Sequence, residues 1–169
     1  AGFMKFGATL HGSNVKTRDA YANMDIAGYN YGVNRYRRDL KNYPDRVIVG
    51  SETFASDAMT FIDIAREHPA LIGDFVWTGM DYLGEVGLGC WEYKDYAPDF
   101  GYGPGWVSAG AGTLDLIGTE TSQLAYTQVA FGLSPVRIGV EPVCFSGQKH
   151  SPAAWRFTNA IESWSWDGC

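Results

Sequence analysis

The sequence predicts an α/β fold built on a parallel β-sheet. Three apolar segments, residues 25–31, 47–54 and 70–77, start 22 or 23 residues apart. Helix-like segments separate them, so the order is βαβαβ, which favours parallel strands joined by right-handed crossovers. The middle segment begins with consecutive Val-Ile-Val, and a strand that is apolar on both faces is typical of a covered parallel sheet.

Prolines mark where the two intervening helices end. Residues 33–43 have helix-like polarity and stop at Pro44, because proline disfavours helical conformation in the residue before it. A second helix begins near Ser56 or Asp57, either of which can cap it. Its apolar residues recur at helical spacing, and it ends before Pro69.

The chain changes character after Trp77. Residues 79–113 are rich in glycine and aromatic side chains, and an irregular segment of this length is usually functional. A helix is predicted from Thr121 or Ser122 to about residue 131, with Gly132 as its stop. The remaining predictions are a loop over residues 1–20, a half-buried strand over 136–142, a strand candidate within 153–166 and a domain boundary near 134–135.

Composition excludes several classes of protein. The 169 residues carry 13 Lys+Arg and 19 Asp+Glu, a net charge of −6, whereas a nucleic-acid partner requires a basic patch. Only 19% of residues are charged, which argues against disorder. No apolar run approaches the roughly 20 residues of a membrane span.

Metals, cofactors and a disulfide framework are not predicted. The three histidines lack ligand spacing, and the chain has neither a phosphate-binding loop nor a serine-nucleophile motif. The three cysteines are odd in number and widely spaced, which argues against a disulfide framework. No secretory leader is visible, so the sequence leaves the compartment open between cytoplasmic and exported.

Polar and aromatic side chains follow all three predicted strands. Asn30 and Tyr31 end the first strand, Glu52 the second and Trp77 the third. Reactive groups gather at the carboxyl ends of strands in parallel α/β folds, so we expect these side chains to converge. An amide, a phenol, a carboxylate and an indole together suit a sugar, whose hydroxyls need bidentate acceptors and whose C–H face stacks on a ring.

Each of these residues also has a purely structural interpretation. Glu52 by itself fits a salt-bridged or strand-end carboxylate, and Trp77 by itself is more often part of a core. Asp81 and Glu85 follow the third strand, and they fit solvated loop charges or caps of backbone amides in the long loop.

Three motifs resemble a known enzyme family. Residues 25–31 (DIAGYNY), 50–54 (GSETF) and 73–85 (GDFVWTGMDYLGE) occur in this order at βα spacing. The set resembles glycoside hydrolase family 2, especially its β-galactosidase-like members. The resemblance implies the last three βα units of a (β/α)₈ TIM barrel over residues 1–134, followed by the start of a β-sandwich over 135–169.

The resemblance also implies roles for individual residues. Glu52 matches the family's nucleophile in the retaining hydrolysis of terminal β-glycosides by double displacement. Tyr31 matches a tyrosine that hydrogen-bonds the nucleophile, and Asn30 lies beside it at the end of the sixth barrel strand. Trp77 matches a substrate-contacting tryptophan on the eighth strand. Asp81 and Glu85 complete the predicted substrate-binding set.

The chain departs from the family at the second catalytic carboxyl. The family's general acid/base is a glutamate preceded by asparagine, and none of the six asparagines here is followed by glutamate. We therefore expect a piece of a longer chain that is inactive alone. The resemblance implies that a glucuronidase of the family would carry an Asn-x-Lys downstream of the nucleophile, to bind the sugar carboxylate. The single Asn-x-Lys here, Asn14–Lys16, lies upstream of Glu52. This position weakens the interpretation as a glucuronidase and favours a β-galactosidase over a mannosidase or another β-glycosidase.

Two other functions remain open. A non-catalytic carbohydrate-binding module would rest on the aromatic-rich residues 91–106, and an unrelated doubly wound α/β domain would make Glu52 structural. The predicted partners are a β-galactoside-like carbohydrate and, because three parallel strands leave two sheet edges open, either a second copy of the chain or the rest of its parent.

Overall fold

The protein consists of two compact units, Ala1–Trp77 and Thr78–Cys169. The computed structural model describes residues 2–86, 88–89, 107–148, 155–156, 158 and 160–161. Within these ranges, none of the helices combines the length and the apolar character that a membrane crossing requires.

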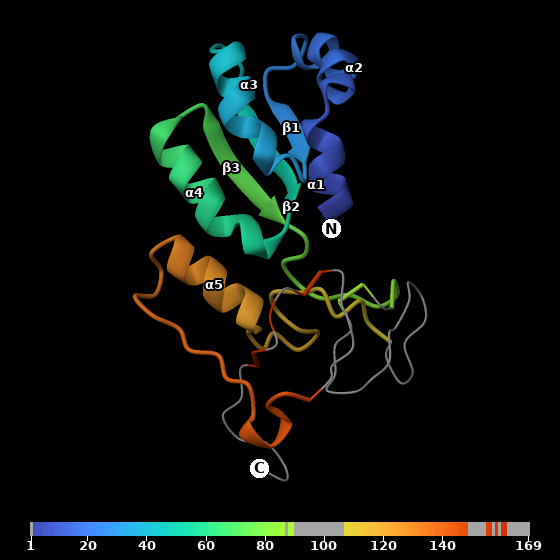
Figure 1. Cartoon of the computed structure of the whole chain (residues 1–169), viewed down its shortest axis with the longest axis vertical. Helices are drawn as coiled ribbons and strands as arrows, with labels where there is room; N and C mark the ends of the chain where they lie inside the picture. The colour runs from blue at the N-terminus through green and yellow to red at the C-terminus, as the bar shows by residue number, and fades with distance from the viewer. Residues whose placement is uncertain are drawn as a thin grey trace. The chain divides into compact units, whose positions relative to one another are not determined.

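The first unit contains the predicted parallel sheet. Strands β1 (Ala27–Asn30), β2 (Ile48–Thr53) and β3 (Leu71–Val76) pair in parallel in the order β1-β2-β3 (Figure 1). The prediction of an α/β fold with three parallel strands is confirmed. The sheet is open, and neither a closed barrel nor a sandwich is seen in the described residues.

The two crossover segments are helical, and each helix ends before the proline that predicts its end. The 3₁₀ turn η1 (Val33–Arg35) leads into α3 (Tyr36–Asn42), and η2 (Ala55–Asp57) leads into α4 (Ala58–Glu67). Asp57 occupies the N-cap of α4 but its side chain makes no capping hydrogen bond. The Asp57 carboxylate is instead paired with Lys5.

The prediction of a loop over residues 1–20 was wrong. These residues form α1 (Gly2–Thr9) and α2 (His11–Tyr21). Contacts with other elements hold these helices: in α2, the ring of Tyr21 stacks on Tyr29 with the ring centroids 4.8 Å apart and packs against the core. Lys5 pairs with Asp57, and the Thr9 carbonyl accepts a hydrogen bond from Arg38 at 3.0 Å.

The core of this unit lies where the strands face the helices. Apolar residues of all three strands pack against α3 and α4, which run alongside the sheet in Figure 1. The alternation of side chains along each strand sends every second one into this layer. The cluster comprises Ala27, Tyr29, Val33, Tyr36, Leu40, Ile48, Phe61, Ile64 and Leu71.

One charged pair is buried inside this core. The guanidinium of Arg35 lies 2.7 Å from the carboxylate of Asp39, and both side chains are almost fully buried. The hydroxyl of Tyr29 also donates to Asp39 at 2.9 Å, and Arg46 donates to that same hydroxyl at 2.9 Å. Burial alone would raise the pKa of Asp39, but the hydrogen bonds from Arg35 and Tyr29 hold this pKa below its ordinary value.

The second unit contains one α-helix among its described residues. Helix α5 (Ser122–Ala130) matches the prediction, and Gly132 ends it with a φ of +72°, a conformation that favours glycine. A 3₁₀ turn, η3 (Val143–Phe145), follows.

The predicted strand over residues 136–142 was wrong. These residues form only an isolated antiparallel bridge between Val140 and Ile161, since the alternating pattern meets no continuous neighbouring strand among the described residues. Most of the strand candidate within 153–166, and all of the aromatic-rich residues 91–106, lie outside the described residues.

Cysteine chemistry also departs from expectation at one position. Cys144, next to Val143 in η3, is disulfide-bonded. The other two cysteines, Cys90 and Cys169, lie outside the described residues.

Candidate functional site

The carboxyl ends of β1 and β2 bring Asn30 and Glu52 together, as the sequence predicts. The two residues are register partners in the sheet. The side-chain amide of Asn30 donates to Glu52 Oε2 at 3.4 Å, and its amide oxygen accepts from Ser51 Oγ at 2.6 Å. Glu52 is half-buried, so its carboxylate is held at the carboxyl end of the central strand and still reaches solvent.

Tyr31 contacts the carboxyl end of β2 through its backbone. Its φ is +49°, a left-handed conformation that bulky residues rarely adopt. Its amide N–H donates to the Glu52 carbonyl at 2.6 Å, and its buried ring packs on Phe54 with the ring centroids 4.3 Å apart. Unusual backbone conformations cluster at functional sites, where the surrounding contacts maintain them.

Trp77 lies on the other side of Glu52. Its backbone N–H donates to the carbonyl of Thr53 at 2.8 Å, and its side chain is half-buried. The carbonyls of residues 52 and 53 are therefore each fixed by an amide of a neighbouring strand end. The end of β2 is held from both sides.

A polar cluster that the sequence analysis missed lies beneath this strand end. Thr53 Oγ1 donates to Asp74 Oδ1 at 2.7 Å. The hydroxyl of Tyr36 and Asp74 Oδ2 are both buried, and neither has a hydrogen-bond partner among the residues that the structure describes. One signal was available in the sequence, because Asp74 is the single charged residue in the apolar segment 70–77.

Burial controls the ionisation of this cluster. The pKa of Asp74 is raised to about 6, mainly by burial and also by the negative charge of Asp57, against the opposing hydrogen bond from Thr53. Burial likewise raises the pKa of Tyr36, with contributions from Asp74 and Asp57. A carboxyl with a pKa near 6 changes charge within the range where many enzymes work.

Asp74 is expected to make the folded chain less stable as the pH rises from 4 to 7. Below pH 4 the carboxyl is protonated in both the folded and the unfolded state. Above that, the unfolded chain releases the proton first, and the stabilisation disappears as the pH passes through the folded pKa of about 6. The expected loss is about 2–3 kcal/mol.

Urea unfolding of the chain at pH 4, 5, 6 and 7 measures this loss. Asp74→Asn should remove it, and Asp63→Asn, at an exposed position of α4, should keep it. The lowered pKa values of Asp39 and Glu67 act in the opposite direction and at lower pH. An identical pH dependence in the wild type and the Asp74 variant would contradict this assignment.

Asp81 and Glu85 belong to the second unit. The carboxylate of Asp81 accepts the backbone amides of Gly110 and Ala111, both at 3.2 Å. This is the amide-capping alternative for Asp81 that the sequence left open. Glu85 has a φ of +45° and accepts a hydrogen bond from the hydroxyl of Tyr82.

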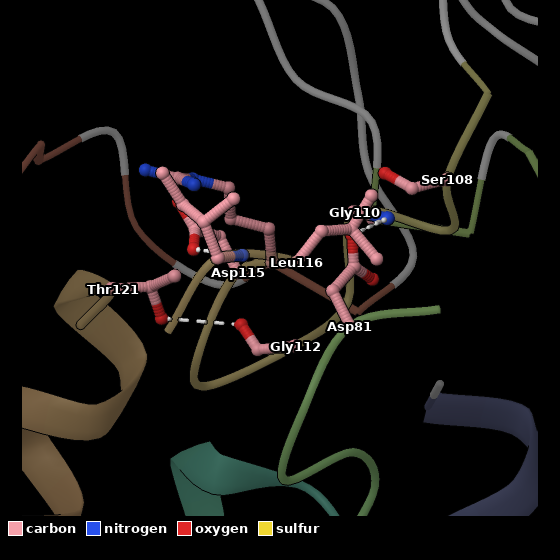
Figure 2. Close-up of a pocket in the computed structure, with 10 residues that line it drawn as sticks. Asp81, Ser108, Gly110, Gly112, Asp115, Leu116 and Thr121 are labelled. Carbon is pink, nitrogen blue, oxygen red and sulfur yellow. Dashed lines mark hydrogen bonds between the residues drawn. The ribbon is translucent and has the colours of Figure 1, made fainter. Parts of the chain in front are cut away.

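Asp81 also lines a pocket of about 330 Å³ in the second unit. Figure 2 shows its carboxylate directed at the backbone of Gly110, and the Thr121 hydroxyl donates to the Gly112 carbonyl at 3.2 Å on the opposite wall. Asp115 Oδ1 accepts two backbone amides of its own turn, which lowers the pKa of its carboxyl. These acidic side chains therefore order the loops around the pocket.

No group of three or more His, Cys, Asp or Glu residues that could hold a metal ion occurs within the described ranges. At the carboxyl ends of β1 and β2, the available chemistry is that of the half-buried Glu52 carboxylate with the Asn30 amide beside it.

Two solved structures to which the chain is similar are glycosyl hydrolases of family 2. The chain is similar to a glycosyl hydrolase family 2 member from Bacteroides cellulosilyticus, with a TM-score of 0.66 and 31% identity over 90% of this chain and 20% of that one. A family 2 member from Bacteroides cellulosilyticus DSM 14838 gives a TM-score of 0.59 and 28% identity over 90% of this chain and 17% of that one. No protein-family model and no curated protein matches the chain.

The fold and the site define the general class of this protein: it is an α/β protein with a carboxylate at the carboxyl end of a parallel strand. Within this class, the chain is similar in structure to a small part of glycosyl hydrolases of family 2, at 31% identity to the first structure. It spans about a fifth of the length of the two solved chains.

Proposed function

We propose that the chain is part of the catalytic domain of a family 2 retaining β-glycosidase, with Glu52 as the nucleophile. The observation that carries the proposal is the position of Glu52. Its carboxylate is half-buried at the carboxyl end of β2, next to the Asn30 amide. Its own carbonyl and that of Thr53 are anchored by neighbouring strand ends, which suits a group that must attack at a defined point.

The proposed reaction is a double displacement. A carboxylate oxygen of Glu52 bonds to the anomeric carbon while the bond to the leaving oxygen breaks, and that oxygen takes a proton from a second carboxyl. Water then attacks the glycosyl ester, gives its proton to the second carboxyl and regenerates Glu52. The second carboxyl must lie about 5–5.5 Å from Glu52, and we assign it to a residue outside this chain.

The other predicted site residues receive supporting roles. Asn30 donates to the nucleophile and is available to a sugar hydroxyl, while Tyr31 orients Glu52 through the strand-end backbone. Trp77 provides an aromatic wall. Asp81 and Glu85 are proposed substrate-binding residues of the second unit.

The preferred substrate class is a terminal β-galactoside. It follows from the resemblance of the three motifs and from the absence of an Asn-x-Lys downstream of Glu52. The chain would then be inactive on its own, because a retaining enzyme without its general acid loses roughly 10²–10⁴-fold in rate.

The proposed architecture is the last three βα units of a TIM barrel over residues 1–134 and the opening of a β-sandwich over 135–169. Two features of the first unit support the barrel. The sheet has open edges at β1 and β3, and Ile72 and Phe75 of β3 are more than half exposed. Such surface suits contact with further strands, supplied by the parent chain or by a second copy.

A mechanism-based inhibitor tests the proposal in the full-length natural protein that contains these residues. A 2-deoxy-2-fluoro-β-galactosyl fluoride should lose fluoride and leave the fluorosugar bonded to the Glu52 carboxylate, because the fluorine at C2 slows hydrolysis of the ester. Peptide mapping by mass spectrometry should find the added sugar on the peptide that carries Glu52. A label on another carboxylate, or none with active enzyme, would refute the assignment.

A further inference from the structure

We propose that Thr53 and Asp74 are positioning residues for Glu52, and this inference rests on the proposed function. The hydrogen bond between their side chains holds the last residues of β2 at the place from which Glu52 reaches the anomeric carbon. Neither residue contacts the substrate in this account; both act through the strand that carries Glu52.

The first step of the argument is an irregularity in the sheet. Gly50 pairs with Asp74 and Thr53 pairs with Val76. Two residues of β2, Ser51 and Glu52, therefore oppose a single residue of β3. This two-against-one count is that of a β-bulge, which re-aims side chains and is common beside active sites. Regular ladder pairing to β3 is interrupted where Glu52 lies.

The second step is that Thr53 restores the connection just past the bulge. Its carbonyl accepts the Trp77 amide at 2.8 Å, and its hydroxyl donates to Asp74 Oδ1 at 2.7 Å, with the Phe75 carbonyl also within 3.3 Å. Thr53 is almost fully buried. The residue that follows Glu52 is thus tied to β3 through both its backbone and its side chain.

The third step concerns the room that this contact needs. A side-chain carbon at Gly50 would lie 2.5 Å from Asp74 Oδ1 and 2.8 Å from the Tyr36 hydroxyl. Both distances are too short for a real contact, so a side chain at position 50 would have to displace the Asp74 carboxyl or the Tyr36 hydroxyl. The observed position of the Asp74 carboxyl therefore depends on the absence of a side chain at Gly50.

The fourth step weighs stability against function. A buried carboxyl with one oxygen unpartnered is costly, and a well-packed apolar side chain is usually at least as stabilising. Within the described part of the chain, Asp74 Oδ2 and the Tyr36 hydroxyl both lack a hydrogen-bond partner. The charged groups around them are Asp57, from η2, and Lys5, which pairs with Asp57 from α1. A position that gives up stability in this way is better explained by alignment of the strand end.

The test compares Thr53→Val with Thr53→Ser in the full-length natural protein. Valine keeps the shape of the side chain and removes the hydroxyl, whereas serine keeps the hydroxyl. Because small misplacements of a reacting group cost about 10²-fold, Thr53→Val should lower kcat by about 10- to 100-fold with KM changed less than about twofold. Thr53→Ser should keep kcat within about threefold of the wild type.

Two further variants separate positioning from stability. Asp74→Asn retains an oxygen that accepts from Thr53, so it should keep most of kcat while the acidic limb of its pH profile shifts. Ile64→Val, in the core of α4, destabilises the fold away from the strand end and should leave kcat unchanged. If Thr53→Val fails to fold, Asp74→Leu takes its place in the same comparison.

The rate of labelling by the fluorosugar distinguishes the two proposals. Wild-type labelling at Glu52 together with slow labelling of Thr53→Val supports both. Wild-type labelling at Glu52 with equally fast labelling of Thr53→Val overturns the positioning role alone. Labelling of a different carboxylate in the wild type overturns the proposed function, and the positioning role with it.

Discussion

Glu52→Gln is expected to lower kcat/KM for an aryl β-galactoside by about 10⁴-fold or more in the full-length natural protein. Glutamine keeps the size of the side chain and its contact with Asn30, but its amide cannot form the glycosyl ester. Glu52 is half-buried and makes one long side-chain hydrogen bond, at 3.4 Å, so the unfolding midpoint should stay close to that of the wild type.

Initial-rate kinetics and a thermal melt on the same preparation measure both expectations. Glu67→Gln, on the exposed surface of α4, is the matched control and should retain full activity. Glu52→Ala should also regain turnover with azide, because the anion attacks the anomeric carbon from the side of the missing carboxylate and gives a glycosyl azide of inverted configuration. More than a tenth of wild-type activity in Glu52→Gln would rule out the nucleophile role.

Asp39→Ala is expected to destabilise the chain by about 3–5 kcal/mol, the largest stability effect predicted for this protein. The Asp39 carboxylate accepts hydrogen bonds from Arg35 and Tyr29 inside the core. Its removal leaves the guanidinium of Arg35 buried without its counter-charge, and a native stability of about 5–15 kcal/mol tolerates such a loss poorly.

Urea or guanidinium unfolding near pH 7 measures the effect of Asp39→Ala. Glu67→Ala breaks the Arg37–Glu67 pair, whose side chains are both about half exposed, and should cost only about 0–1 kcal/mol. Asp39→Asn should fall between the two, because it keeps an oxygen for Tyr29 and Arg35. Equal losses in Asp39→Ala and Glu67→Ala would show that the buried pair contributes little.

Local sequence was sufficient for the framework of the first unit. The apolar segments became β1, β2 and β3, and Pro44 and Pro69 ended the preceding helices. The rule that polar groups gather at the carboxyl ends of parallel strands also predicted that Asn30 and Glu52 converge, and the structure makes them register partners. These features depend on periodicity and on proline chemistry, which are readable without knowing what packs against what.

Contacts between distant residues decided what local sequence could not. Helices α1 and α2 are held by contacts with residues distant in sequence, such as the pairing of Lys5 with Asp57 and the packing of Tyr21 against the core. The alternation over residues 136–142 predicted a strand, but a strand needs a neighbour, and among the described residues pairing is limited to the bridge between Val140 and Ile161.

In the candidate site, too, the sequence predicted one part and the tertiary structure revealed another. The sequence alone identified Glu52 as the candidate nucleophile, because this residue directly follows an apolar strand and its motif resembles that of family 2 glycoside hydrolases. Only the tertiary structure identified the support beneath it. The bulge in β2 turns Thr53 toward Asp74, a residue 21 positions away. Such a contact arises from the register between two strands, and strand register is set by packing across the whole sheet.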